Sequence, residues 1–224
     1  MQPPAPLRQQ ATLVFALAMI AGYVDGYGLL AFSTFLSFMS GNTTQTGTNL
    51  GRADLALALP SAVAIGAFLL GIFTGNLRSP APSNTRPHDR LLLTAVGLML
   101  CTACVGLWLR WFTQIPSITL IAFAMGIMNT TFSRIGNEPV NLTFVTGTLN
   151  KIGTHLAMAA KRVPLADAEG ARDTHISRAL LLTGVWASFL LGAVLAGVAT
   201  VTLQEWTLLP AAGALMVAAA AARG

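Results

Sequence analysis

The sequence predicts an all-α polytopic membrane protein with about six transmembrane helices, arranged as a 3+3 inverted repeat with two re-entrant or broken-helix motifs. Three observations support this fold class: an apolar composition, apolar segments of membrane length, and a polar motif that occurs twice. Hydrophobic residues make up 54% of the 224 residues and charged residues 9%, whereas a soluble domain has about 25% charged residues. The expected partner is therefore the lipid bilayer and not nucleic acid.

Six segments have roughly the 20 mostly apolar residues that a helix needs to cross a bilayer core. They are approximately 11–32, 55–77, 91–112, 116–134, 178–201 and 206–222. The first segment follows Arg8, as the apolar region of a signal peptide would. It continues almost to Met39 without a convincing small-residue cleavage site, so we interpret it as a retained first helix.

A polar motif is repeated without a gap at residues 38–50 and 144–156. The two copies share five of thirteen residues, including both glycines. A second shared block follows each copy, at Phe68–Gly71 and Phe189–Gly192, and the offset grows from 106 to 121 residues between the blocks. Internal duplication in so apolar a chain is typical of membrane proteins built from structural repeats.

Both copies of the motif are too polar for ordinary spans and too apolar for ordinary loops. They either cross the membrane, which gives eight spans, or dip into it, which leaves six. The six-span alternative places only Arg52 and Arg110 on one side of the membrane. The other eleven basic residues then share one side: Arg8, Arg78, Arg86, Arg90, Arg134, Lys151, Lys161, Arg162, Arg172, Arg178 and Arg223. With eight spans the division falls to about nine against four. Because basic residues concentrate on the cytoplasmic side, six spans with both termini inside are favoured.

Three spans per repeat predict that the second repeat is inverted relative to the first. The first repeat covers residues 1–114 and the second covers residues 115–224. The first motif then enters the membrane from outside and the second from inside, on either side of a pseudo-twofold axis near the midplane. The charged segment 161–175, present only in the second repeat, is expected to be a solvated cytoplasmic loop.

Each motif has the residues of a helix start inside the membrane. Ser40 and Asn42 are good N-cap residues, and Gly41 permits a tight turn where the helix breaks. A helix start at this depth would direct free backbone N–H groups at a cavity. Candidate solute or ion contacts are therefore Ser40, Gly41, Asn42, Thr43, Thr146, Gly147 and Thr148. The alternative is that both motifs are capped turns that only hold the fold together.

Asp25 is the one acidic residue well inside a predicted span. A carboxylate there costs about 2.5–3.5 kcal/mol to insert, so it should face a cavity or be neutral. Its approximate counterpart in the second repeat is Asn129, so the pair suits a proton or cation site in one half only. The alternative is that Asp25 binds backbone N–H groups near the membrane interface.

Three further patterns have weaker functional meaning. Lys151 and His155 share a face of the second motif, where they contact an anionic solute or lie at the cytoplasmic boundary. Cys101 and Cys104 have the spacing of redox and zinc motifs, but no cluster of His or Cys completes such a site. We therefore expect no metal and no cofactor. The small-residue faces at Gly71–Gly75 and Ala193–Gly197 allow close helix packing, within the fold or in a homodimer.

Four segments together resemble the YoaK family of bacterial membrane proteins (DUF1275). They are Gly22–Asp25, Phe38–Thr43, Gly126–Asn129 and Phe144–Leu149, and the similarity covers nearly the whole chain. Family members typically have a basic residue after the first motif, where this chain has the neutral Gln45. The resemblance implies a bacterial inner-membrane protein of about six helices and brings no established activity.

The preferred function is a small secondary transporter or channel for a small solute, with proton coupling through Asp25. Its site would lie at the midplane, between the two repeated motifs. The alternative is a membrane-embedded scaffold or interaction protein in which the motifs only build the fold. No nucleophile elbow, phosphate-binding loop or metalloprotease motif occurs in the sequence, so we do not expect an enzyme.

Overall fold

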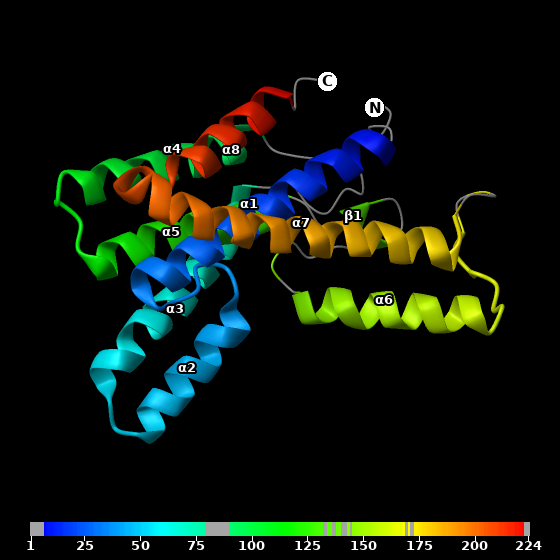
Figure 1. Ribbon diagram of the computed structural model, residues 1–224, viewed down its shortest axis with the longest axis horizontal. Helices are drawn as coiled ribbons and strands as arrows, with labels where there is room; N and C mark the ends of the chain where they lie inside the picture. Colours follow the sequence, from blue (N-terminus) through cyan, green and yellow to red (C-terminus); the bar gives the residue numbers. More distant parts are fainter. Residues whose placement is uncertain are drawn as a thin grey trace.

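The computed structural model consists almost entirely of helices (Figure 1). It describes residues 7–78, 90–131, 134–135, 138–139, 143, 145–168, 170 and 173–221. The first half contains α1 (Leu7–Phe32), α2 (Met39–Gly51), α3 (Leu55–Arg78) and α4 (Arg90–Trp108). The second half contains α5 (Gln114–Thr130), the strands β1 (Arg134–Ile135) and β2 (Glu138–Pro139), α6 (Val145–Ala160), α7 (His175–Thr202), the 3-10 helix Gln204–Trp206 and α8 (Leu209–Ala221).

Four of the six expected spans are confirmed as helices long and apolar enough to cross a membrane, namely α1, α3, α4 and α7. Helices α5 and α8 coincide with the other two expected spans but have only 17 and 13 residues. The prediction that the fourth span reaches residue 134 was wrong. Helix α5 ends at Thr130, and Arg134 and Ile135 pair with Pro139 and Glu138 as a short antiparallel ladder.

The core of the bundle is built from large aliphatic side chains of several helices. Leu17, Leu93, Leu100, Ile118 and Met125 are fully buried. Many other large apolar side chains point outward instead, above all on α3 and α7, including Leu69, Leu70, Leu77, Leu191 and Val198. Contiguous apolar surface of this extent is not typical of a soluble monomer, whereas lipid is an adequate solvent for it.

Two helix pairs make the most extensive contacts in the molecule: α1 packs along α7, and α3 packs along α5. Helix α2 covers part of α3, and α6 covers part of α7. Helix α4 packs against α8 and α5. In Figure 1, α2 and α6 each start near the middle of the molecule and extend toward different ends.

The α1–α7 contact depends on two glycines that bring the backbones together. A Cβ atom on Gly22 would lie 2.0 Å from the carbonyl oxygen of Phe189, and one on Gly192 would lie 1.9 Å from the carbonyl oxygen of Met19. No side chain fits at such distances. Over the full length of the pair the contacts advance in the same direction, from Phe15 against Gly184 to Gly26 against Ala196, so α1 and α7 are parallel.

The α3–α5 contact has the same construction. A Cβ atom on Gly71 would lie 2.1 Å from the carbonyl oxygen of Phe123, and one on Gly126 would lie 2.2 Å from the carbonyl oxygen of Phe68. Gly126 stands 104 positions after Gly22, and Gly192 stands 121 positions after Gly71. The two helix crossings are therefore made by equivalent residues of the two halves.

The predicted small-residue face at Gly71–Gly75 is used inside the fold. Gly71 lies against Phe123, and a Cβ atom on Gly75 would meet Thr130 of α5. Ala193 of the second face lies against Gly26 of α1, whereas a Cβ atom on Gly197 would meet nothing within 4 Å. The close packing that these patterns predict is thus found within the chain, and the homodimer stays a prediction.

Candidate functional site

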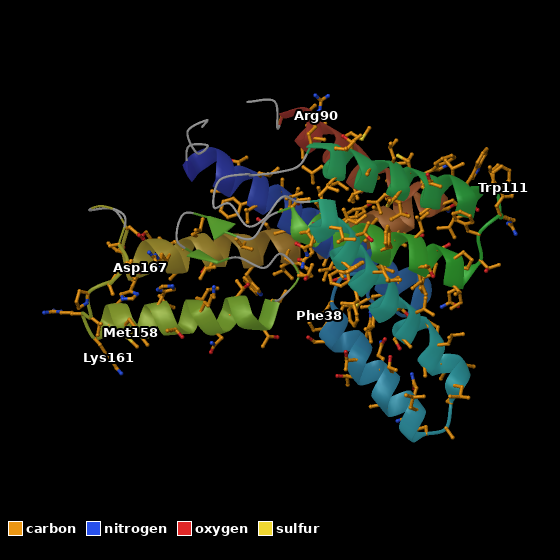
Figure 2. All side chains as sticks on the ribbon, turned by 180° about the vertical axis from the view of Figure 1, so that it is seen from behind. Phe38, Arg90, Trp111, Met158, Lys161 and Asp167 are labelled. Atoms are coloured by element: carbon orange, nitrogen blue, oxygen red, sulfur yellow. The ribbon has the colours of Figure 1, made fainter. Side chains whose placement is uncertain are left out.

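The turn between α1 and α2 carries the densest set of buried polar contacts in the first repeat. Ser33 follows the last residue of α1 with a φ of 53°, and the N–H group of Ser33 donates to the carbonyl oxygen of Leu29. The N–H group of Thr34 donates back to Gly28. This left-handed helix end turns the chain back toward the middle of the molecule, where Figure 2 places Phe38 at the start of α2.

Asp25 holds this turn from the neighbouring helix. Its Oδ1 atom accepts hydrogen bonds from the backbone N–H groups of Leu36 at 2.9 Å, Ser37 at 2.6 Å and Phe38 at 3.2 Å. Its Oδ2 atom accepts a hydrogen bond from the Ser37 hydroxyl at 2.9 Å. Because these donors immediately precede Met39, the carboxylate of Asp25 lies at the N-terminal, positive end of α2 and fixes the turn that leads into it.

The environment of Asp25 differs in one respect from the expected cavity. The residue is 3% exposed, and four donors from residues 36–38 surround its carboxylate. Its proximity to the first motif agrees with the expectation. Its hydrogen bonds agree with the alternative, in which Asp25 binds backbone N–H groups. The turn before α2 provides these donors.

Asn42 closes the same turn from the other side. Its Oδ1 atom accepts a hydrogen bond from the N–H group of Phe35 at 3.1 Å, and its Nδ2 atom donates to the carbonyl oxygen of Phe35 at 2.7 Å. Asn42 is fully buried. The turn is therefore fixed at both edges, by Asp25 from α1 and by Asn42 from α2.

The predicted N-cap roles of Ser40 and Asn42 were wrong. Helix α2 begins at Met39, its N-cap position is Phe38, and no side chain of the cap residue bonds the first turn. The predicted turn at Gly41 was wrong as well, because Gly41 lies inside the helix. A Cβ atom there would lie 2.7–2.8 Å from the rings of Phe38 and Phe35, which pack edge to face at 5.2 Å.

The second repeat has an equivalent but neutral contact. Asn129 stands 104 positions after Asp25, and Thr143 stands 106 positions after Ser37. The Thr143 hydroxyl donates to Oδ1 of Asn129 at 3.4 Å, as the Ser37 hydroxyl does to Asp25. Sequence reasoning did not select Ser37 or Thr143, although each directly precedes a repeated motif and offers a hydroxyl.

The remaining predicted site residues lie along α2 and α6. Thr148 is the buried residue of α6, as Asn42 is of α2, and the two occupy equivalent motif positions. Ser40, Thr43 and Thr146 are exposed, whereas Gly147 and Lys151 are partly buried. The described hydrogen bonds of Asp25 and Asn42 go to residues 35–39 of the first repeat, and the described hydrogen bond of Asn129 goes to Thr143 of the second.

Possible metal ligands and thiols do not gather into a site in the described part of the chain. Among the described residues, no three His, Cys, Asp or Glu side chains gather as a metal site would require. Cys101 and Cys104 are free thiols, and the Cys104 Sγ atom lies 3.4 Å from the carbonyl oxygen of Glu205. The described contacts of Cys104 are therefore those of a packing residue.

Comparisons with known proteins agree on a family. A family model described as a protein of unknown function (DUF1275) matches residues 13–221. The UPF0700 transmembrane protein RA0705 of Rhizobium meliloti is 34% identical over 210 residues, which cover 93% of this chain and 84% of that protein. The UPF0700 transmembrane protein YoaK of Bacillus subtilis is 26% identical over 142 residues, which cover 62% of this chain and 63% of the relative. No solved structure matches.

Proposed function

The chain belongs to the DUF1275 family, a family of multi-pass membrane proteins. We propose that it is a transporter or channel for a small polar solute. Its pathway would lie along the two repeated motif helices, α2 and α6. We propose neither an enzymatic activity nor a cofactor. The observation that carries the proposal is the pair of short motif helices, which begin with polar residues near the middle of the molecule (Figure 1).

Neither motif helix is long enough to cross a bilayer. At 1.5 Å per residue, the 13 residues of α2 extend about 20 Å and the 16 residues of α6 about 24 Å, against a hydrocarbon core of about 30 Å. Non-helical backbone at membrane depth is tolerated only where protein or water surrounds it. Asp25 and Asn42 supply such partners for the turn before α2, which supports a motif that dips into the membrane and returns.

Both motif helices present polar residues on their exposed sides, mixed with apolar ones. Exposed residues on α2 are Ser40, Thr43, Thr44, Gly47, Thr48, Leu50 and Gly51, and on α6 they are Thr146, Leu149, Asn150, Gly153, Thr154, Leu156, Ala157 and Ala160. The hydroxyls of Thr43, Thr44 and Thr48 donate to carbonyl oxygens one turn earlier. Their oxygen lone pairs therefore stay available to accept hydrogen bonds, as a surface in contact with water or a polar solute requires.

An inverted relation between the halves is supported by their packing. Equivalent glycines make the α1–α7 and α3–α5 crossings. In Figure 1, α1 runs from right to left, whereas its counterpart α5 runs from left to right. An inverted repeat places equivalent sites around an axis in the membrane plane, which is a common construction for transporters.

We propose that the protein lies in a bacterial inner membrane with both termini in the cytoplasm. The division of eleven basic residues against two supports this orientation. Aromatic residues gather where Arg110 lies: Trp108 and Trp206 have ring centroids 5.1 Å apart, and Trp111 is 75% exposed. Tryptophans at the headgroup level are typical of a membrane interface, here on the outer side.

Reporter fusions test this orientation. We expect fusions after Arg86, Asp167 and Gly224 to give cytoplasmic signals, because the basic residues beside them resist translocation. A fusion within the segment Arg52–Asp54, between α2 and α3, should report the outer side. A periplasmic signal at Arg86 would refute six spans and favour eight.

Transport itself is tested with purified protein and a panel of small polar solutes. Solutes that raise the midpoint of thermal unfolding are selected, because a ligand that binds only the folded state stabilises it. Their uptake into proteoliposomes is then compared with uptake into protein-free vesicles. We expect at least one stabilising solute to enter proteoliposomes faster and to exchange with labelled solute inside.

The scaffold alternative has one observation in its favour. The buried polar groups Asp25 and Asn42 are both occupied by backbone partners, as a purely structural motif requires. The scaffold alternative predicts that no solute of the panel stabilises the protein. It also predicts that solutes enter proteoliposomes no faster than protein-free vesicles.

A further inference from the structure

The C-terminal half of α6 and the first residue of α7 bring two histidines together. The Nδ1 atom of His155 lies 2.8 Å from the Nδ1 atom of His175, and the ring centroids are 5.1 Å apart. At this distance one ring donates a proton to the lone pair of the other. The Nε2 atom of His175 is buried and has no hydrogen-bond partner among the described groups. Within the described contacts, the ring of His175 is thus oriented by His155.

We propose that His155 and His175 bind a divalent transition-metal ion between their Nδ1 atoms, with water completing the coordination. Neutral imidazole is a good ligand for Cu²⁺, Ni²⁺ and Zn²⁺. When the ion binds, the proton shared by the two Nδ1 atoms moves to Nε2 of the ring that carried it, so both rings stay neutral. This site is separate from the Asp25 group and goes beyond the proposed transport function.

The ligand chemistry indicates the class of metal. The metal-free rings stand at the hydrogen-bond distance of 2.8 Å and must turn slightly to direct both Nδ1 lone pairs at one ion. For nitrogen and oxygen ligands the affinity of divalent ions rises from Ni²⁺ to Cu²⁺ and falls again at Zn²⁺, so Cu²⁺ should bind best.

The charges next to His175 are compatible with a bound cation. Arg178, one turn further along α7, donates from Nε and Nη2 to the two carboxylate oxygens of Asp173 at 2.9 and 2.8 Å. Its Nη1 atom donates to Oδ2 of Asp167 at 3.0 Å. Two carboxylates thus surround this guanidinium and offset its charge next to His175. Thr174 and Ser177 form a capping box, which fixes the start of α7 and hence His175.

The pair supplies two ligands, and solvent must supply the others. Within the described part of the chain no third metal-ligating side chain joins a cluster. Closed structural sites have four protein ligands, so this site should exchange its ion readily and lose it to a chelator. Figure 2 labels Met158, Lys161 and Asp167 at this end of α6 and α7, away from Phe38 at the start of α2.

The test uses the full chain without a polyhistidine tag, freed of metal with a chelator. The midpoint of thermal unfolding is measured with Cu²⁺, Ni²⁺, Zn²⁺ or Mg²⁺, and Cu²⁺ stoichiometry is measured by titration. We expect Cu²⁺ to raise the midpoint by several degrees, Ni²⁺ and Zn²⁺ to raise it less and Mg²⁺ not at all. One Cu²⁺ should bind per chain, and its electron paramagnetic resonance spectrum should show coupling to imidazole nitrogen.

Two variants test whether the metal ion binds at His155 and His175. His155→Gln and His175→Gln retain a side chain that can hydrogen-bond across the two helices, so each should fold while losing the response to metal and at least tenfold in Cu²⁺ affinity. The matched control is His88→Ala, at the third histidine of the chain, which should respond as the unmodified protein does. An absent metal response, no nitrogen coupling, or a response that persists in both glutamine variants would overturn the proposal.

Discussion

Replacing Asp25 with leucine should unfold the start of α2 and destabilise the protein by about 3 kcal/mol or more. The reason is that three backbone N–H groups, those of Leu36, Ser37 and Phe38, would lose their shared acceptor inside the protein. Each buried donor left without a partner costs about 1–3 kcal/mol. The midpoint of thermal unfolding in detergent and the yield of folded protein measure the effect.

Asp25→Asn is the matched control for this prediction. Its amide oxygen can still accept from the backbone N–H groups, and its NH₂ group can donate to the Ser37 hydroxyl, so the protein should fold with a small loss of stability. If Asp25 is also the coupling group, this variant should lose proton-driven uptake while solute exchange survives. Leucine and asparagine variants of equal stability would contradict the structural role that the hydrogen bonds assign to Asp25.

Substitution of the crossing glycines should have the second large effect. In Gly192→Ala the new methyl group would lie 1.9 Å from the carbonyl oxygen of Met19, and in Gly71→Ala it would lie 2.1 Å from that of Phe123. Backbone atoms cannot rotate away as a flexible side chain can, so the paired helices must separate. Overpacking typically costs about 1–3 kcal/mol, and we expect the upper end of this range for each variant.

Two other glycines on the same helices provide controls. A methyl group on Gly197 of α7 or on Gly66 of α3 would meet nothing within 4 Å. Gly197→Ala and Gly66→Ala should therefore leave the unfolding midpoint unchanged or raise it slightly, because alanine is the better helix former. The same loss of stability in all four variants would show that helix propensity, and not the crossings, determines the effect.

Local patterns in the sequence were sufficient to predict the helices. Apolar runs identified the segments that become α1, α3, α4 and α7, because lipid-facing and buried positions both select apolar residues. The shared Phe68–Gly71 and Phe189–Gly192 blocks indicated equivalent positions, and these are the helix crossings. The end of α5 could not be read in this way, since the segment between Thr130 and Arg134 holds no proline or glycine that would stop a helix, whereas the chain turns into a β-ladder at Arg134.

The contacts of the candidate site could be predicted only in part. Sequence reasoning connected Asp25 with the first motif, but it placed the helix cap on Ser40 and Asn42 because N-cap preferences are local. The residue that fixes the turn before α2, Asp25, comes from another helix and lies 11–13 residues before its N–H donors. The role of Gly41 was ambiguous for a similar reason. The sequence alone does not distinguish a glycine that makes room for an aromatic ring from a glycine that permits a turn.

The central claim is that α2 and α6 line one pathway that both sides of the membrane can reach. Single cysteines placed at Thr43 and Thr146, in a Cys101→Ala, Cys104→Ala background, test it most directly. A membrane-impermeant thiol reagent is applied to right-side-out and to inside-out vesicles. Controls are Ala53 between α2 and α3, Lys161 after α6, and Leu70 on the apolar outer face of α3.

We predict that Thr43→Cys and Thr146→Cys are labelled from both sides, and that a stabilising solute slows their labelling. Ala53→Cys should be labelled only from the outer side, Lys161→Cys only from the inner side, and Leu70→Cys from neither. Labelling of Thr43→Cys and Thr146→Cys from a single side each, or from neither, with the controls as expected, would contradict a shared pathway and favour the scaffold.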